Sequence, residues 1–538
     1  MGNSVTDRDS PPLVVGAGVA GLACALRLAQ AGLRPRVFEA NPLCGGRLSG
    51  APLFTLEHAG RSWDFPGEHG IHGFWTQYRN LRALLDEHGI RPPFTPARGQ
   101  EWIVGAGPRV RRAELGSWLR HSPLPAPFHY LALLANPRFL AMFSPLDLMR
   151  LPWVGGMLLA TALSLDPMRE GDLLEGMTVA DLLWGWPDSL RAFVFALARN
   201  GLSSDAGAID LAGFIAFLRF YTFLRRDAGA FDYLAENAGT AIIDPLVAAL
   251  REAGGTVVTG VRATALEPLE GGDWLVRWER TGPEGVGSQP VLTSPDWGAA
   301  SGTVAASQVV LAADAPGTRA ILTQGAATAP LAGRLHWPQA RPAVIVRLWF
   351  GTSPRLRAES GMCGGDFTID NFFWLHALQT PFQRWHEATD GSAVEAHIYS
   401  PPELLEQPDT ALLALAVHDV LRAYPELRGT ILASHLTRNP ATHTLFQVGV
   451  TDRHLGVQTP WQGVWCCGDW IRHESPALFL ERACVTGLAA ANGVLAAHGL
   501  PACPLVPYAG PEPLARLLEL VYRGARRGMA RVRRAVGR

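Results

Sequence analysis

The chain of 538 residues contains no lysine, and all 47 of its basic residues are arginine. Without a lysine amine, the protein cannot form a Schiff base with a carbonyl substrate or hold a catalytic water on a side-chain ammonium. The formal net charge is only −1 and no nucleic-acid-binding motif is present, so we expect no nucleic acid as a partner. We also predict no metal site.

Cysteine pairs and membrane-spanning runs are missing too. The chain has seven cysteines, an odd number, and no Cys-x-x-Cys pair, which predicts reduced thiols. The adjacent Cys466 and Cys467 are interpreted as small buried strand residues, with a redox-active pair as the alternative. The best apolar run, Leu151 to Leu165, has 15 residues with one proline and two glycines, so it suits an interfacial or buried segment better than a membrane span. The polar N-terminus carries no signal-peptide pattern.

A glycine-rich turn near the start predicts a dinucleotide-binding site. The apolar run 13–15 leads into the segment 16–21, which reads GAGVAG, and a helix is expected over about 19–31. The first glycine permits a tight turn, the second lets a pyrophosphate touch the backbone, and the third lets the helix pack closely on the strand. The cofactor contacts predicted in this turn are Gly16, Gly18, Ala20 and Gly21.

Two features that follow this turn fit a dinucleotide with a second phosphate region. The next apolar stretch ends at Glu39, at the distance where a carboxylate can bind ribose hydroxyls, and Ala40 is taken as a neighbouring contact. The triplet Gly45-Gly46-Arg47 then offers two glycines to approach a phosphate and an arginine to pair with it. A surface turn with a solvated arginine is the alternative for this triplet.

The segment 463–470, GVWCCGDW, predicts a buried strand that runs into Gly468-Asp469, and a long helix is expected to begin near Pro476. With the N-terminal motifs, it resembles the FAD-binding superfamily that includes amine oxidases and carotene desaturases. The resemblance implies that Asp469 binds the ribityl chain of FAD and that the following helix points its N-terminus at the flavin. It further implies contacts to FAD at Val261, Leu480 and Ala483.

The segment 68–82, EHGIHGFWTQYRNLR, is most similar to the carotene desaturase/methyltransferases, the isorenieratene synthase branch of that superfamily. Ile71, Trp75 and Arg79 replace aromatic residues of the family pattern. The similarity covers nearly the whole chain up to about residue 500. It implies that Gly70, Ile71 and His72 contact FAD, and that the substrate is a carotenoid or another long isoprenoid.

The resemblance implies a mixed α/β (α+β) fold of the amine oxidase and phytoene desaturase type. A Rossmann-like FAD-binding domain is accompanied by a substrate domain that has a β-sheet and a helical, apolar insertion. The segment 281–303 is expected to be a long hairpin loop. The predicted segments are 11–80, 235–330 and 455–500 for the FAD-binding domain, 81–234 and 331–454 for the substrate domain, and 512–538 for a basic amphipathic tail.

His69 and His72 are the candidate catalytic residues. Hydride transfer from a hydrocarbon would leave an allylic cation, and an imidazole could stabilise this cation or accept its proton. The alternative role is to hydrogen-bond the backbone around the flavin. Aromatic stretches within 128–143 and 214–223 are expected to form core or to line an apolar substrate tunnel.

The resemblance implies an FAD-dependent oxidoreductase that desaturates a carotenoid ring end group, with an intramolecular methyl shift as the ring becomes aromatic. The alternatives are an acyclic carotene desaturase, a redox-neutral carotenoid isomerase, an amine oxidase and a non-catalytic carotenoid-binding flavoprotein. Amine oxidases of this superfamily commonly use a lysine-held water, which this chain cannot provide.

Within the tail, residues 514–538 carry eight arginines and one acid, with apolar residues at helical spacing. This pattern is typical of a helix that lies on a membrane surface, and a solvated terminal helix is the alternative. We therefore expect a cytoplasmic protein that is peripheral to the inner face of the membrane. A membrane quinone is the expected electron acceptor, by analogy with the family.

Overall fold

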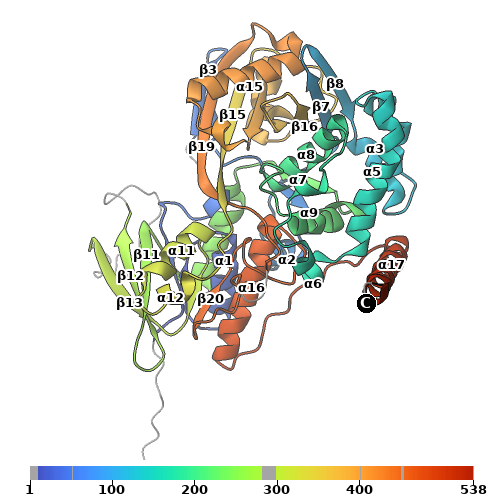
Figure 1. The fold of residues 1–538 in the computed structure, drawn as a ribbon. Coiled ribbons are helices and arrows are strands. Elements are labelled where there is room, and N and C mark those ends of the chain that lie inside the picture. Colours follow the sequence, from blue (N-terminus) through green and yellow to red (C-terminus); the bar gives the residue numbers. More distant parts are fainter. Residues whose placement is uncertain (1–9, 51–52, 282–298, 400, 450–452, 537–538) are drawn as a thin grey trace, which may run out of the picture.

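The computed structural model describes residues 10–50, 53–281, 299–399, 401–449 and 453–536 (Figure 1). The glycine-rich turn belongs to a five-stranded parallel sheet with the strand order β10-β2-β1-β14-β20. Three separate parts of the chain therefore contribute to one sheet. Its strands are β1 (Leu13–Val15), β2 (Arg36–Glu39), β10 (Thr256–Thr259), β14 (Val309–Leu311) and β20 (Val464–Cys466).

The two faces of this sheet are covered differently, because successive strand residues point to opposite sides. Val14 and Val310 pack against helices on one face, and Leu13 and Val309 pack against a second sheet on the other. The helices are α1 (Val19–Gln30), α10 (Asp244–Glu252, after a π-turn at Gly239–Ile243) and α16 (Phe479–Ala497). The second sheet is antiparallel and is flanked by two helices; its elements are β11 (Val261–Pro268), β12 (Trp274–Arg280), β13 (Ser301–Ala306), α11 (Ala315–Gln324) and α12 (Ala329–Ala332).

A seven-stranded mixed sheet forms the centre of the second domain, in the order β19-β15-β18-β17-β16-β7-β8. Two of its strands come from the region that was expected to be mostly helical, because β7 pairs in parallel with β16 across a long stretch of sequence. Helices α13 (Thr380–Thr389), α14 (Pro402–Leu405) and α15 (Asp409–Ala423) accompany this sheet. The strands are β7 (Glu101–Ala106), β8 (Arg109–Glu114), β15 (Ala340–Phe350), β16 (Ser360–Gly365), β17 (Asn371–Trp374), β18 (Ser392–Ile398) and β19 (Ile431–Thr444).

The rest of the 79–234 region is largely helical and apolar (Figure 1). Its aromatic residues Phe139, Phe143, Phe214 and Phe220 are buried in hydrophobic clusters. Its helices are α2 (Arg79–Glu87), α3 (Gly116–Arg120), α4 (Pro137–Leu140), α5 (Pro145–Ser164), α6 (Pro167–Glu170), α7 (Val179–Leu182), α8 (Asp188–Leu202) and α9 (Leu211–Leu218), with 3-10 turns at Phe128–Ala135 and Gly171–Leu174 and a π-turn at Arg219–Phe223.

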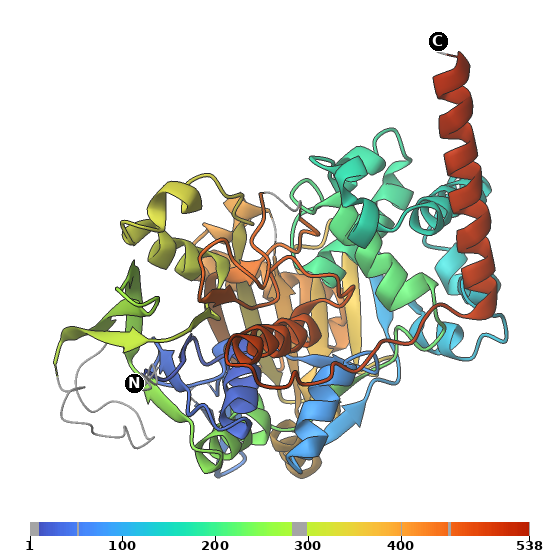
Figure 2. The ribbon, with the colours of Figure 1, turned by 90° about the horizontal axis from the view of Figure 1, so that it is seen from below.

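Short strands and the tail helix complete the fold. Two small antiparallel sheets consist of β3 (Leu53–His58) with β4 (Arg61–Pro66), and of β5 (Gly73–Trp75), β9 (Phe231–Leu234) and β6 (Phe94–Pro96). The tail forms one long helix, α17 (Pro513–Val536), that packs beside α5 and extends outward from the helical region (Figure 2).

Two expectations about element boundaries were wrong. The C-terminal helix begins at Phe479 and not near Pro476. The buried Arg482 guanidinium donates hydrogen bonds to the carbonyls of Ile471, Ser475 and Ala477, and these bonds hold the segment before the helix in a non-helical conformation. Most of the expected loop 281–303 lies outside the described residues, but its last three positions belong to strand β13.

Candidate functional site

The first glycine turn lies at the carboxyl end of strand β1, where open parallel sheets bind their ligands. A Cβ atom at Gly16 would lie 2.8 Å from the Ala312 carbonyl oxygen, and one at Gly21 would lie 1.9 Å from the Gly16 carbonyl oxygen. Packing within the protein therefore requires both glycines. A Cβ at Gly18 would meet no protein atom within 4 Å, so this position is open to a ligand. Ala20 lies buried in the first turn of α1, and a Cβ at Gly487 of α16 would lie 2.2 Å from its carbonyl oxygen.

Glu39 ends strand β2 and holds the glycine turn in place. One carboxylate oxygen accepts a hydrogen bond from the Ala17 amide at 2.8 Å, and the other accepts from the amide and side chain of Asn41, both at 2.9 Å. Burial raises the pKa of Glu39, and the three donors oppose this effect. Asn41 was missed by sequence reasoning. The Ala40 carbonyl accepts a hydrogen bond from Thr281, which connects this turn to the end of β12.

The second glycine turn packs directly on the first. Gly45 and Gly46 have left-handed backbones, with φ of +114° and +56°. The Gly45 amide donates to the Ala17 carbonyl at 2.8 Å, and a Cβ at Gly46 would lie 3.6 Å from the Gly18 Cα atom. The two glycine turns therefore form one surface of exposed backbone beside the N-terminus of α1, which suits a pyrophosphate.

Arg47 connects the N-terminal motifs with the C-terminal one. Its guanidinium forms an ion pair with Asp469 and also donates to Nδ1 of His443 at 3.2 Å. Because arginine only donates, His443 Nδ1 must be unprotonated and its Nε2–H faces the Leu202 carbonyl. The Gly468 amide donates to Thr486 of α16 at 2.9 Å, which fixes the turn that carries Asp469. Residues 47 and 469 thus meet in one site, and sequence reasoning missed the contribution of His443.

The predicted flavin-facing loop, residues 68–72, lies between the dinucleotide-binding motifs and the second domain. Glu395 of β18 accepts the Ile71 amide at 2.7 Å, and Asn439 of β19 donates to the His69 carbonyl at 2.7 Å. Arg347 of β15 donates to the Glu68 carbonyl at 2.9 Å. Three neighbouring strands of the seven-stranded sheet therefore hold the loop by its backbone, and the side chains of His69 and His72 remain available.

Both histidines of this loop are neutral at pH 7. Burial, with a smaller contribution from the charge of Arg47, lowers the pKa of His69 to about 3 and that of His72 to about 4. His69 also lies near His72 and His443. Within the described residues, neither ring has a hydrogen-bond partner, so the predicted alternative role of binding backbone groups is not seen there. Neutral, unpartnered imidazoles can accept a proton or face a cation.

A buried polar chain behind the loop was missed by sequence reasoning. His397 Nε2 lies 2.7 Å from Glu395, and its Nδ1 lies 2.7 Å from the Tyr399 hydroxyl. Burial alone would raise the pKa of Glu395, but Arg347 and His397 hold it well below its usual range. Glu395 and His397 alternate along β18, and Tyr399 continues this alternation directly after the strand, so the three share one face. This alternation of polar residues in an otherwise apolar strand was the available signal.

His397 also fixes the shape of the loop. Gly70 has a φ of +152°, and a Cβ there would lie 3.3 Å from His397 Cε1. This predicted FAD contact therefore needs glycine for both its backbone and its neighbour.

The remaining predicted contacts lie on two elements, β11 and α16. Val261 is buried at the start of β11, next to the turn after β10. Leu480 is half-buried and Ala483 is buried in the first turns of α16. Between them, Glu481 is fully buried and accepts the amides of Asn80 and Leu81, so it fixes the N-terminus of α2. Glu481 therefore has a structural role.

A cavity of about 310 Å³ opens at a different place, between the helical region and residues 447–449 and 453–454. Asp210, His336 and Arg453 line it, but none of the predicted site residues does. In the described part of the chain, no cluster of three or more His, Cys, Asp or Glu side chains could hold a metal ion.

Comparisons with known proteins agree with this geometry. Residues 14–88 match the family described as NAD(P)-binding Rossmann-like domain. The chain is 27% identical to the carotenoid phi-ring synthase of Streptomyces griseus, over 95% of this chain and 93% of the relative. It is 23% identical to the carotenoid phi-ring synthase of Chlorobaculum tepidum, over 92% of this chain and 89% of the relative.

Among solved structures, cyclohexylamine oxidase from Brevibacterium oxydans has a TM-score of 0.62 at 15% identity and covers 91% of this chain and 99% of its own. A putrescine oxidase bound to putrescine has a TM-score of 0.61 at 14% identity, with 90% and 99% covered. This likeness shows the fold, which is the predicted mixed α/β fold of the amine oxidase type. The Rossmann-like domain and this fold support FAD as the cofactor, and the open backbone at Gly18 fits it.

Proposed function

We propose that this chain, which belongs to the superfamily of FAD-dependent carotene desaturases and amine oxidases, desaturates the ring end group of a carotenoid and so makes the ring aromatic. The similarity to two carotenoid phi-ring synthases over more than nine-tenths of the chain carries this proposal. The held loop 68–72 supports it, because this loop contains the sequence that resembles that branch and it presents two free imidazoles.

The proposed reaction separates a hydride from a proton. Bound FAD would supply a two-electron oxidation as the hydride acceptor for a ring C–H bond, and because a ring with one double bond must lose four hydrogens to become aromatic, each ring would undergo this oxidation twice. The ring is left as an allylic cation, and a methyl group that migrates within the ring keeps all carbons in the product. His69 or His72 then accepts the proton from the neighbouring carbon. Although their low pKa values make these histidines weak bases, a carbocation is a much stronger acid, so the transfer is downhill.

The surrounding residues position this loop and exclude water. Arg347, Glu395 and Asn439 hold the backbone of residues 68–72, so the imidazoles do not need to move to reach the substrate. Tyr221, in the π-turn after α9, packs against Trp75 just beyond the loop with ring centroids 5.4 Å apart, and apolar packing there would protect a cation from attack by water. A hydrocarbon end group would bind there by apolar burial alone.

The other candidates receive weaker support. A probable zeta-carotene desaturase of Synechococcus elongatus is 29% identical, which favours an acyclic desaturase, but the match covers only 30% of this chain. The amine oxidases share the fold, whereas the chain has no lysine to hold a water. A redox-neutral isomerase or a non-catalytic carotenoid-binding flavoprotein would use the same fold without net oxidation.

We further propose that the enzyme works in the cytoplasm, peripheral to the inner face of the membrane, and passes its electrons to a membrane quinone. A carotenoid is dissolved in the bilayer, and a quinone is an acceptor found in the same place. The basic, amphipathic tail supports the membrane location.

Incubation of the purified, FAD-loaded protein with cyclic carotenes, acyclic carotenes and polyamines tests the proposal. Oxidation of a cyclic carotene is expected, with a new absorption spectrum and a lower mass. A shifted spectrum at unchanged mass would indicate an isomerase, oxidation of acyclic carotenes alone an acyclic desaturase, and peroxide formed from polyamines an amine oxidase. Carotene binding without any product would indicate a carrier.

A further inference from the structure

The tail helix α17 is packed with its polar side inward and its apolar side outward. Glu519 is only 6% exposed, and Arg523 and Arg526 on the same face are partly buried. On the opposite side, four large apolar residues are 56–65% exposed, although such residues normally face the protein in a surface helix. They are Leu517, Leu520, Val521 and Met529.

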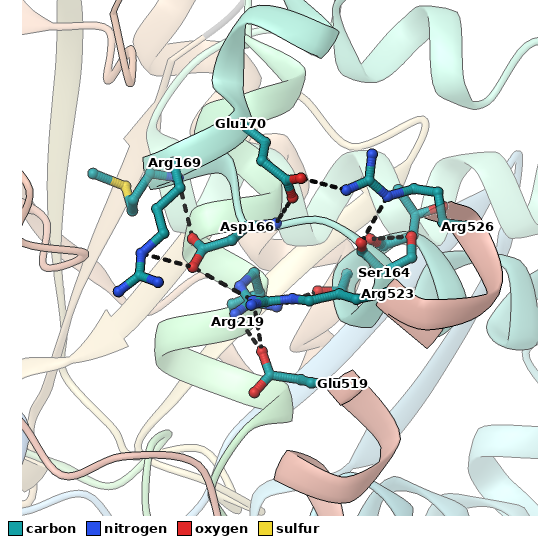
Figure 3. Close-up of polar contacts among 11 residues, drawn as sticks. Ser164, Asp166, Arg169, Glu170, Arg219, Glu519, Arg523 and Arg526 are labelled. Atoms are coloured by element: carbon teal, nitrogen blue, oxygen red, sulfur yellow. Dashed lines mark hydrogen bonds and ion pairs between the residues drawn. The ribbon is translucent and has the colours of Figure 1, made fainter. Parts of the chain in front are cut away.

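Specific ion pairs fix this orientation (Figure 3). Glu519 pairs with the buried Arg219, whose other nitrogen donates to the Ala162 carbonyl at 2.6 Å. Arg523 contacts Glu519 at 3.2 Å and Asp166 at 3.4 Å. Figure 3 shows that these contacts join the tail to the end of α5 and to α6. Rotating the helix to bury its apolar face would break a buried charge network, which is strongly unfavourable.

One turn further along the tail, Arg526 strengthens the same network. It pairs with Glu170 of α6 and donates to the Ser164 carbonyl at 2.9 Å. The outward apolar face is therefore specified by contacts along about two helical turns, from Glu519 to Arg526, and it is not the result of a loosely attached helix.

Helix α5, which packs beside α17, exposes a second apolar face. Leu146, Met149, Trp153 and Met157 recur at helical spacing and are 52%, 77%, 73% and 37% exposed. The opposite face of α5 is buried in the protein through residues such as Val154. In Figures 1 and 2, both helices lie on the same side of the molecule, away from the parallel sheet.

Helix α5 is long and apolar enough to cross a membrane, but its contacts indicate that it lies along the surface. Arg150 is exposed on the apolar face, and Asp147 is hydrogen-bonded to Ser144 and Ser189. A spanning orientation would place these charges in hydrocarbon and would strip Val154 from its core contacts. An interfacial orientation leaves the charges at the level of the headgroups.

The charges around the exposed apolar residues select the partner. In the part of α17 whose side chains are described, the exposed charged residues are Arg516, Arg527 and Arg531, and the one acid, Glu519, is buried. A second copy of the chain bound through the same face would bring arginines against arginines. Anionic phospholipid headgroups, in contrast, offer phosphates to the guanidinium groups and hydrocarbon to the apolar side chains.

We propose that α5 and α17 form a lipid-docking surface, which inserts its apolar side chains into the headgroup region of a bilayer rich in anionic phospholipid. The inner, charged face of α17 binds the protein, and its outer, apolar face binds the membrane. This inference deepens the proposed membrane location and rests on it, since a bilayer-dissolved substrate requires the enzyme to reach the lipid.

Vesicle flotation of the full-length, FAD-loaded protein tests the docking surface. The probes are vesicles of phosphatidylcholine alone and of phosphatidylcholine with about 30% phosphatidylglycerol, an anionic phospholipid. We expect binding to the anionic vesicles, about fivefold weaker binding for each outer arginine removed in R516Q and R527Q, and loss of binding in L520Q/V521Q and in M149Q/W153Q.

Matched controls change the same residue types elsewhere. R355Q/R357Q removes two exposed arginines of the second domain, and I431Q/L432Q removes two exposed apolar residues of β19; both should bind vesicles like the unchanged protein. FAD content and the thermal midpoint confirm that each variant is folded. Equal binding by α17 variants and controls would overturn the proposal, as would a lipid-free dimer that L520Q/V521Q dissociates.

The result for this surface and the result for the proposed function can be separated. Activity on a detergent-solubilised carotene does not require docking, so L520Q/V521Q should keep that activity while losing vesicle binding. If the unchanged protein floats with anionic vesicles but oxidises no carotene, the proposed function fails and the docking surface stands. If it oxidises carotene in detergent but does not float, the docking surface fails alone.

Discussion

At the scale of single residues, the ion pair between Arg47 and Asp469 joins the two ends of the proposed cofactor site. It brings together two turns that lie more than four hundred positions apart in the chain. The arginine also donates to His443, and its charge adds to burial, the main cause, in lowering the pKa of the two loop histidines. One guanidinium therefore affects cofactor binding and the proposed proton acceptors together.

Replacing Asp469 with asparagine should weaken FAD binding. The variant keeps the shape of the side chain but leaves Arg47 without its anion, and charge-assisted hydrogen bonds contribute about 1.5–3 kcal/mol, so a loss of about 10- to 100-fold in affinity is expected. Titration of the apoprotein with FAD, followed by flavin fluorescence, measures it. D188N, at an exposed helix N-terminus, is the control, and equal affinity of the two variants would exclude a role for Asp469.

The two loop histidines predict a pH dependence of stability. His72 has a pKa of about 4 in the folded chain and an ordinary value of 6.5, so between these values only the unfolded state takes up a proton. Stability is therefore lost as the pH falls from 6.5 to 4, by about 1.4 kcal/mol per pH unit for this one histidine. We expect the change in unfolding free energy per pH unit, measured by urea unfolding across this range, to be smaller by that amount in H72Q and unchanged in H121Q. Identical slopes in H72Q and the unchanged protein would mean that His72 is not buried as described.

At the scale of secondary-structure elements, strand β18 supports the loop that carries the proposed chemistry. Glu395 accepts hydrogen bonds from Arg347, His397 and the Ile71 amide. The side chains of Arg347, Glu395 and His397 are almost fully buried. Such a network gives its stability only when it is complete, because a single missing partner leaves a buried charge unpaired.

The variant E395Q should therefore be strongly destabilised. Loss of the carboxylate leaves Arg347 without an anion in the core, which costs about 3–5 kcal/mol of unfolding free energy. Chemical denaturation, monitored by circular dichroism, gives the value. E426Q, on an exposed turn, should change it little. A loss of under about 1 kcal/mol in E395Q would show that the network does not hold the loop.

The contact between helices α1 and α16 gives a second prediction at this scale. A Cβ at Gly487 would lie 2.2 Å from the Ala20 carbonyl oxygen, so G487A must push the two helices apart and disturb the glycine turn. We expect lower FAD content and a lower thermal midpoint. G524A in α17 is the matched control, since its new methyl group would meet no atom within 4 Å. A G487A protein with full FAD content and an unchanged midpoint would contradict the packing described.

At the scale of the whole molecule, local sequence patterns predicted the dinucleotide-binding elements better than the second domain. The glycine turns and Glu39 act through neighbours close in sequence, so their residue types and spacing carry the information, whereas Asp469 pairs with Arg47 across 422 positions. The pairing of β7 with β16 joins segments about 260 positions apart, and no local periodicity encodes it. The same reason explains why Asn41, two positions after Glu39, was within reach of sequence reasoning, while Asn439, which is 370 positions from its partner His69, was not.

The tail shows a different limit at this scale. Its sequence pattern predicted an amphipathic helix, which the structure confirms, but not which face meets the protein. That choice depends on Asp166, Glu170 and Arg219, which belong to distant helices and supply the opposite charges. Helical periodicity alone would have placed the apolar side against the core.

The central claim is that the protein oxidises a carotenoid ring without losing carbon. The most direct test is the mass of the product formed from a cyclic carotene by the FAD-loaded enzyme with a quinone as acceptor. We predict a product that keeps every carbon and is lighter by an even number of hydrogens, with one quinone reduced for every two hydrogens removed. A product of unchanged mass, or one that has lost a methyl group, would contradict the account.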